Sequence, residues 1–132
     1  MSSQHDKNRI HVVVGLVYNS QNQILVAERQ AHKFQGGRWE FPGGKIEPNE
    51  KPLYALKREL QEEIGIQILA AKSFSQFKHD YPDKIIFLDV WKITDFQNEP
   101  HGKEGQEIKW VSLHELLTLD IPDANWDIVK LL

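Results

Sequence analysis

Residues 44–66, GKIEPNEKPLYALKRELQEEIGI, contain the strongest structural signal in the chain. Proline favours the first position of a helix and glycine favours the left-handed residue after its end, so Pro52 and Gly65 predict a helix over residues 52–64. Apolar residues recur inside it at helical spacing and form one stripe: Leu53, Leu56, Leu60 and Ile64. The stretch therefore predicts an amphipathic helix that packs on a core.

Three acidic residues lie at the edge of that stripe. At about 100° per residue, Glu59, Glu62 and Glu63 fall within roughly a third of the helix circumference, where like charges repel. Arg58 can reach Glu62 one turn on and neutralises only part of this charge. Carboxylate oxygens suit hard cations such as Mg²⁺ or Mn²⁺ better than zinc. Two interpretations stay open, a divalent metal site and a solvated acidic face.

Strand and turn patterns alternate on both sides of the helix. They predict strands at residues 10–18, 23–27, 39–41, 74–77, 84–93 and 107–111, with a turn at 81–83. A capping box at residues 112–115 predicts a short helix, and residues 126–132 predict a terminal one after Asn125. Residues 29–38 predict a long polar loop that covers a site. The order of elements indicates an α/β fold with a mixed β-sheet sandwiched between α-helices.

The composition narrows the class of protein. The 132 residues, 40% hydrophobic and 27% charged, suit one globular domain over residues 1–132. With no cysteine, the chain has no disulfide framework, thiolate zinc site or cysteine nucleophile, which fits a reducing cytoplasm. The longest nearly apolar run, residues 12–18, is too short to cross a bilayer. A net charge of -3 does not favour a nucleic-acid duplex as partner. We expect a cytoplasmic monomer whose ligand is a small anion, compensated locally.

Residues 44–66 resemble the Nudix box without a departure. That pattern is Gly, five residues, Glu, seven residues, Arg-Glu-aliphatic, one residue, Glu-Glu, one residue, Gly-aliphatic. Seven identities at about 7% usage each arise by chance roughly once in 10⁸ windows, so the match is specific. The resemblance implies the Nudix fold. It also implies Mg²⁺-dependent hydrolysis of a nucleoside diphosphate linked to another group, with Mn²⁺ as a substitute ion.

The resemblance also implies roles for individual residues. It makes Glu59, Glu62 and Glu63 metal ligands, with the Gly43 backbone carbonyl and Glu104 as further ligands. Glu104 lies on a glycine-flanked loop that can swing toward the metal. Either Glu59 or Glu104 serves as the general base. The remaining motif residues organise the loop and the helix: Gly44, Glu50, Arg58 and Gly65.

Beyond the box, residues 39–45, 58–63, 102–106 and 122–125 resemble the branch of the family that removes 8-oxo-dGTP. This implies hydrolysis of 8-oxo-dGTP, and less well of dGTP, to the monophosphate and pyrophosphate, which prevents mutagenic incorporation. Asn125 offers the donor and acceptor that reading a guanine edge requires. The implied substrate-binding residues are Arg29, Phe41, Tyr81 and Asn125, with Lys84 at the border. The chain departs from the branch at His101, where an aromatic residue is expected, and in residues 30–38, which bears on base selectivity.

Ordinary structural interpretations stand beside these roles: an exposed loop acid at Glu104, a helix N-cap at Asn125, a surface ion pair at Arg29 and a core aromatic at Phe41. Other functions also stay open. The substrate could be another nucleotide, such as a dihydroneopterin triphosphate or a nucleoside diphosphate sugar. A nucleotide-binding sensor without turnover is the alternative from a different class.

Overall fold

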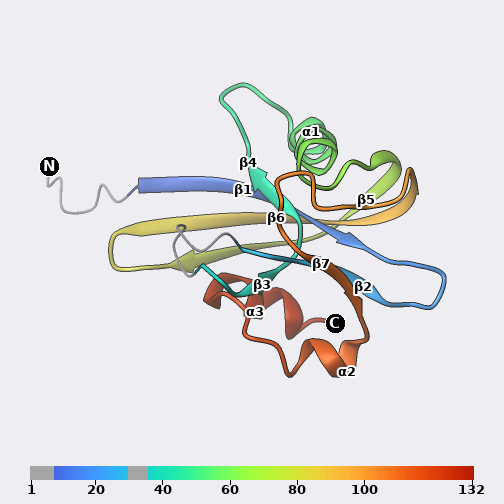
Figure 1. Ribbon diagram of the computed structural model, residues 1–132. Helices are drawn as coiled ribbons and strands as arrows, with labels where there is room; N and C mark the ends of the chain where they lie inside the picture. Colours follow the sequence, from blue (N-terminus) through green and yellow to red (C-terminus); the bar gives the residue numbers. More distant parts are fainter. Residues whose placement is uncertain (1–7, 30–35) are drawn as a thin grey trace, which may run out of the picture.

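A computed structural model describes residues 8–29 and 36–132, so most of the predicted covering loop lies outside the described residues. The chain forms two sheets (Figure 1). The four-stranded sheet has the order β4 (Gly43–Lys45), β1 (Asn8–Val17), β6 (Lys84–Gln97) and β5 (Gln67–Asp80). The three-stranded sheet has the order β3 (Trp39–Glu40), β2 (Ile24–Glu28) and β7 (Ile108–Val111). The helices are α1 (Pro52–Ile64), α2 (Leu113–Leu116) and α3 (Asp123–Val129).

The predicted α/β fold, a mixed sheet between helices, is confirmed. In Figure 1, α1 lies on one side of the strands, and α2 and α3 lie on the other. The four-stranded sheet is mixed because β1 runs parallel to β6 and antiparallel to β4. The antiparallel three-stranded sheet is an addition that the strand patterns did not predict. Within residues 8–29 and 36–132, no helix is long and apolar enough to span a bilayer.

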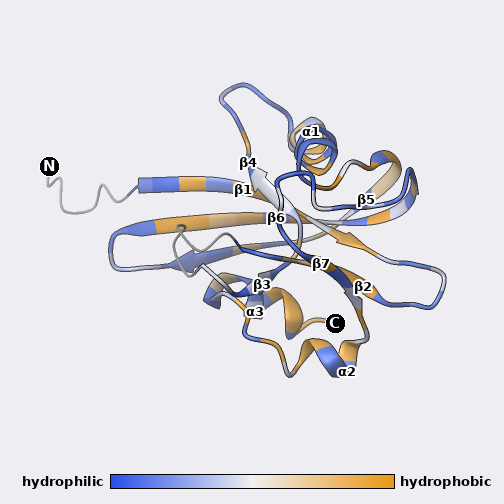
Figure 2. Ribbon diagram, viewed as in Figure 1, coloured by the Kyte–Doolittle hydropathy of each residue, from blue (hydrophilic) through white to orange (hydrophobic). Residues whose placement is uncertain are grey.

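Strand β1 lies in the middle of the four-stranded sheet, which explains its almost continuous apolar sequence. Residues Val13 to Val17 are all buried. Val13 packs with the apolar face of α1, whereas Val14 faces a second cluster that includes residues of α3. Figure 2 shows hydrophobic residues on α1, on α3 and along β1. Next to Val14, Gly15 lets α1 approach closely, because a Cβ atom there would lie 2.9 Å from Cδ2 of Leu60. This contact fixes the height of α1 above the sheet.

Helix α1 has the predicted bounds. Gly65 adopts the left-handed conformation at φ +73°, and its N–H donates to the Gln61 carbonyl at 3.1 Å. At the shorter helix α2, Ser112 is the predicted cap, since its Oγ accepts from the Glu115 N–H at 3.1 Å. The local signals for helix ends were therefore sufficient in both places.

The predicted bounds of two strands and one helix are wrong. The strands expected at 74–77 and 84–93 extend to Gln67–Asp80 and Lys84–Gln97. Backbone pairing with β6 extends β5 through residues with weak strand preference, where the register is irregular. The terminal helix spans Asp123–Val129 instead of residues 126–132. Its N-cap is Pro122, so Asn125 lies inside the helix and does not cap it.

Candidate active site

A cavity of about 580 Å³ opens between α1 and β4 on one side and the β5–β6 hairpin and α3 on the other. Its two ends differ in chemistry. One end, which we call the acidic end, is formed by Gly43, Gly44, Glu59, Glu63 and Glu104. The other, which we call the base end, includes Phe41, Tyr81, Leu88, Ala124 and Asn125. The volume is in the range typical of small-molecule sites.

The two glycines of β4 bring its backbone against the helix acids. A Cβ atom on Gly44 would lie 2.2 Å from Cδ of Glu59, so a side chain there would displace that carboxylate from its present position. A Cβ atom on Gly43 would lie 2.1 Å from the Val13 carbonyl oxygen. The Gly43 N–H donates to Oε2 of Glu63 at 3.2 Å. Gly43 is therefore required by the close approach of β1, and Gly44 leaves the Glu59 carboxylate where it stands.

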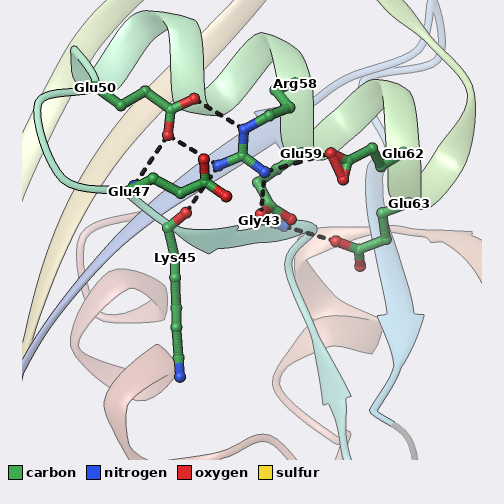
Figure 3. A network of polar contacts seen from close by, with 8 residues as sticks. All are labelled: Gly43, Lys45, Glu47, Glu50, Arg58, Glu59, Glu62 and Glu63. Atoms are coloured by element: carbon green, nitrogen blue, oxygen red, sulfur yellow. Dashed lines mark hydrogen bonds and ion pairs between the residues drawn. The ribbon is translucent and has the colours of Figure 1, made fainter.

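Arg58 connects the preceding loop to the acids of α1 (Figure 3). Its Nε and Nη2 donate to the two carboxylate oxygens of Glu50 at 2.8 and 2.9 Å, and Nη2 also donates to the Lys45 carbonyl at 3.1 Å. Nη1 donates to Glu59 at 2.9 Å and to Glu62 at 3.4 Å. The Arg58 guanidinium lowers the pKa of Glu50 to about 2. This geometry supports the organising role that the motif implies for Glu50 and Arg58.

The acidic end carries more negative charge than its cations offset. Burial, together with the nearby carboxylates of Glu40, Glu104 and Glu59, raises the pKa of Glu63 to about 8. Burial also raises the pKa of Glu59, against the opposing effect of Arg58. Buried like charges of this kind fit a site that a divalent cation completes.

The donor set fits a hard ion such as Mg²⁺, because it consists of carboxylate and backbone oxygens. As the side chains stand, no three acidic or histidine residues of the described part of the chain are grouped closely enough to hold a metal. The reason lies in their present partners. Glu59 and Glu62 contact Arg58, and Glu63 accepts from Gly43. These contacts compete with a cation for the same oxygens.

Glu104 reaches the cavity on a loop that is bonded to the last turn of α1. The backbone N–H groups of His101 and Lys103 donate to the carbonyls of Ile64 and Glu63 at 3.0 and 3.1 Å. The Gln106 side chain donates to the same Glu63 carbonyl and accepts from the Glu104 N–H, both at 2.9 Å. The loop thus satisfies helix-end carbonyls and holds Glu104 beside the acids of α1.

Sequence reasoning missed the contributions of Gln106 and Glu40. Gln106 bridges two backbone segments. Its residue type could have indicated this role, because an amide side chain both donates and accepts hydrogen bonds. Glu40 lines the cavity and accepts from Nη1 of Arg29 at 3.0 Å. Its charge also acts on Glu63. Its position at the end of a two-residue strand gave no signal in the sequence.

At the base end, Asn125 and Phe41 lie together. Asn125 is 9% exposed, and its Oδ1 accepts from the Phe41 N–H at 3.3 Å. Phe41 is 4% exposed, so it is a core aromatic that also lines the cavity. Tyr81 is buried, with its hydroxyl hydrogen-bonded to the Ala124 backbone. Arg29 lines the cavity while it pairs with Glu40. The structure brings all four predicted substrate-binding residues to this cavity.

Comparisons with known proteins agree with this geometry. The sequence profile of the NUDIX domain matches residues 7–132. The 8-oxo-dGTP diphosphatase of Escherichia coli (strain K12) is 39% identical over 121 residues, which are 92% of this chain and 94% of that protein. The CTP pyrophosphohydrolase of the same organism is 35% identical over 113 residues, 86% and 84% of the two chains. A solved structure from work on MutT of Aliivibrio salmonicida and Vibrio cholerae matches with a TM-score of 0.82 and 41% identity, covering 93% and 95%.

Proposed function

The chain belongs to the Nudix hydrolase family, and from that premise we propose that it hydrolyses 8-oxo-dGTP to 8-oxo-dGMP and pyrophosphate, and dGTP less well. The observation that carries the proposal is the cavity itself. It joins an acidic end on α1 to a base end with a buried amide at Asn125. A nucleotide bound along it has its phosphates among the glutamates and its base beside Asn125.

The acidic end would hold the ion through Glu59, Glu63 and Glu104, with the Gly43 carbonyl. Glu62, which is 54% exposed and does not line the cavity, would join them by turning away from Arg58. When bound there, Mg²⁺ would offset the negative charge of the phosphates. The chain's own residues do the rest. Arg58 orients Glu59, and Gln106 holds Glu104. One of these two carboxylates accepts the proton of the water that attacks phosphorus, and pyrophosphate leaves.

The base end would recognise the purine through Asn125. Its Oδ1 is oriented by the Phe41 N–H. Within the described part of the chain, its Nδ2 has no hydrogen-bond partner, so the amide keeps a donor for an oxygen on the base edge. Oδ1 has a second lone pair for the N7–H that oxidation creates. The apolar walls at Phe41 and Leu88 cover the faces of the ring.

The deciding measurement is pyrophosphate release from 8-oxo-dGTP and dGTP over a range of concentrations, with Mg²⁺ and then with EDTA. We expect metal-dependent release, with kcat/KM for the oxidised base higher by about 100-fold, because a buried polar site rejects an analogue that lacks a partner group. Equal or poor cleavage of both nucleotides would contradict the proposed substrate.

Another nucleotide substrate is the second candidate, because one relative is a CTP pyrophosphohydrolase. CTP, a dihydroneopterin triphosphate and a nucleoside diphosphate sugar therefore belong in the same panel. A sensor without turnover would hydrolyse none of them, as measured by pyrophosphate release from the triphosphates and by nucleoside monophosphate release from the nucleoside diphosphate sugar. The proposal also takes the protein to be a monomeric, single-domain, cytoplasmic enzyme, and light scattering after size exclusion tests the monomer.

A further inference from the structure

We propose that the contact between His79 and Asp127 positions the β5–β6 hairpin against α3, two elements that line the base end, and so sets nucleotide affinity without touching the nucleotide. The inference rests on the proposed function. Nδ1 of His79 lies 3.2 Å from Oδ2 of Asp127. The first residue belongs to the β5–β6 hairpin and the second to α3. Neither lines the cavity, yet both elements supply residues that do.

On the hairpin side, His79 supports Tyr81. The two rings are in tilted contact, with centroids 4.7 Å apart. In the strand register His79 pairs with Ile86, so both side chains lie on the sheet face that carries the cavity. Nζ of Lys84 lies 5.3 Å from the centre of the Tyr81 ring on the opposite arm of the hairpin turn. His79 therefore lies directly behind the cavity-lining tip of the hairpin.

On the helix side, Asp127 lies one half-turn after Asn125. Helix α3 has only seven residues, and its N-cap has no side-chain hydrogen bond. Helices this short depend on tertiary contacts for their position. Asn125 accepts a hydrogen bond from Phe41. Ala124 contacts Tyr81 of the hairpin turn, and Asp127 contacts His79. Releasing Asp127 removes one of these attachments and loosens the amide that faces the base.

The surrounding charges do not replace the pair. Lys130 lies 3.8 Å from the other oxygen of Asp127 but is 72% exposed, and Lys78 and Asp80 pair with each other at 4.0 Å on exposed positions. His79 and Asp127 are less exposed, at 27% and 29% of their side chains. A hydrogen bond with a charged partner in this setting affects affinity by about threefold to tenfold.

The test measures kcat and KM for 8-oxo-dGTP with Mg²⁺, and the Kd of 8-oxo-dGMP by calorimetry. The variants are His79→Ala, Asp127→Ala and the double substitution, with exposed Lys78→Ala as the matched control. We expect each single variant to raise KM and Kd by about threefold to tenfold, with kcat within about twofold of wild type. The double variant should be no worse than either single one, because both break the same contact.

Conservative rescue separates positioning from folding. His79→Gln keeps a hydrogen-bond donor, so its KM and Kd should lie close to the wild-type values. This variant can be measured even where His79→Ala does not fold. Additive effects in the double variant, or unchanged KM and Kd in variants of an active enzyme, would overturn the inference and leave the proposed function standing. A wild-type protein that neither binds 8-oxo-dGMP nor hydrolyses 8-oxo-dGTP would overturn the proposed function first, and the inference with it.

Discussion

The two ends of the cavity are built in opposite ways. The acids of α1 lie within five consecutive residues, and helix geometry alone puts Glu59 and Glu63 on one side. At the base end, Phe41 and Asn125 are 84 residues apart and meet only because the chain folds. Sequence spacing is therefore enough to locate functional residues that lie on one helix. Residues that come together from distant elements can be located only once the packing of the fold is known.

The largest expected effect tests the acidic end. Glu59→Gln should lower kcat with Mg²⁺ by about 10²- to 10³-fold, because it removes a charge that acts in the transition state. The fold should survive, since the amide is the same size and Gly44 still leaves room. Circular dichroism checks the fold and a pyrophosphate assay the rate. Glu47→Gln, on the exposed loop nearby, is the control. Wild-type activity in Glu59→Gln would refute the assignment of this end.

Arg58→Lys should have the next largest effect, about 10- to 100-fold in kcat/KM. Lysine keeps the charge but cannot make the two-pronged contact with Glu50 while also reaching Glu59. Steady-state kinetics measures the loss, and exposed Lys57→Arg on the same helix is the control. A rate equal to wild type would mean that charge alone suffices and the loop geometry at this end is dispensable.

Asn125→Ala tests the base end of the cavity. We expect the preference for 8-oxo-dGTP over dGTP to fall by about tenfold, through KM, with kcat for dGTP little changed. The ratio of the two kcat/KM values is the readout. Ser112→Ala, which removes the cap of α2 away from the cavity, is a control for general loosening. If the ratio holds, base selectivity lies elsewhere in the cavity.

The smallest expected effect is a pH-dependent change in stability at Glu63 in metal-free protein. Its pKa is about 8 in the folded state, against about 4.5 when exposed. Between these two values the folded state binds a proton that the unfolded state has released. The free energy of unfolding is therefore highest below pH 4.5 and falls as the pH rises to about 8.

Glu63→Gln removes this loss, so in EDTA the Tm of the variant should rise relative to that of wild type between pH 5 and 8, by on the order of 4 °C. Differential scanning fluorimetry measures the shift, with exposed Glu62→Gln as the control. A Tm difference that stays constant with pH would show that Glu63 carries no burial penalty.

The same contrast explains what could be predicted from the sequence. Pro52, Gly65 and the apolar stripe predicted α1 to the residue, because caps and periodicity are local. The full length of β5 and the start of α3 were not predicted, because strand pairing and the contact of Asn125 with Phe41 override local preference. The site divides in the same way. Glu104 was found by resemblance, but its support by Gln106 required the structure.

The parallel pairing of β1 with β6 has a consequence for synthesis. Residues 8–17 are made well before their parallel partner, residues 84–93, so one edge of β1 stays unpaired until most of the chain has left the ribosome, while β4 can pair with the other edge earlier. Pairing over such a separation is slow, because a long loop must close before any contact compensates its entropy. The acidic helix is finished early on the ribosome, yet the strand beneath it gains its longest pairing from a segment made much later. The order of translation and the order of assembly therefore differ in this enzyme.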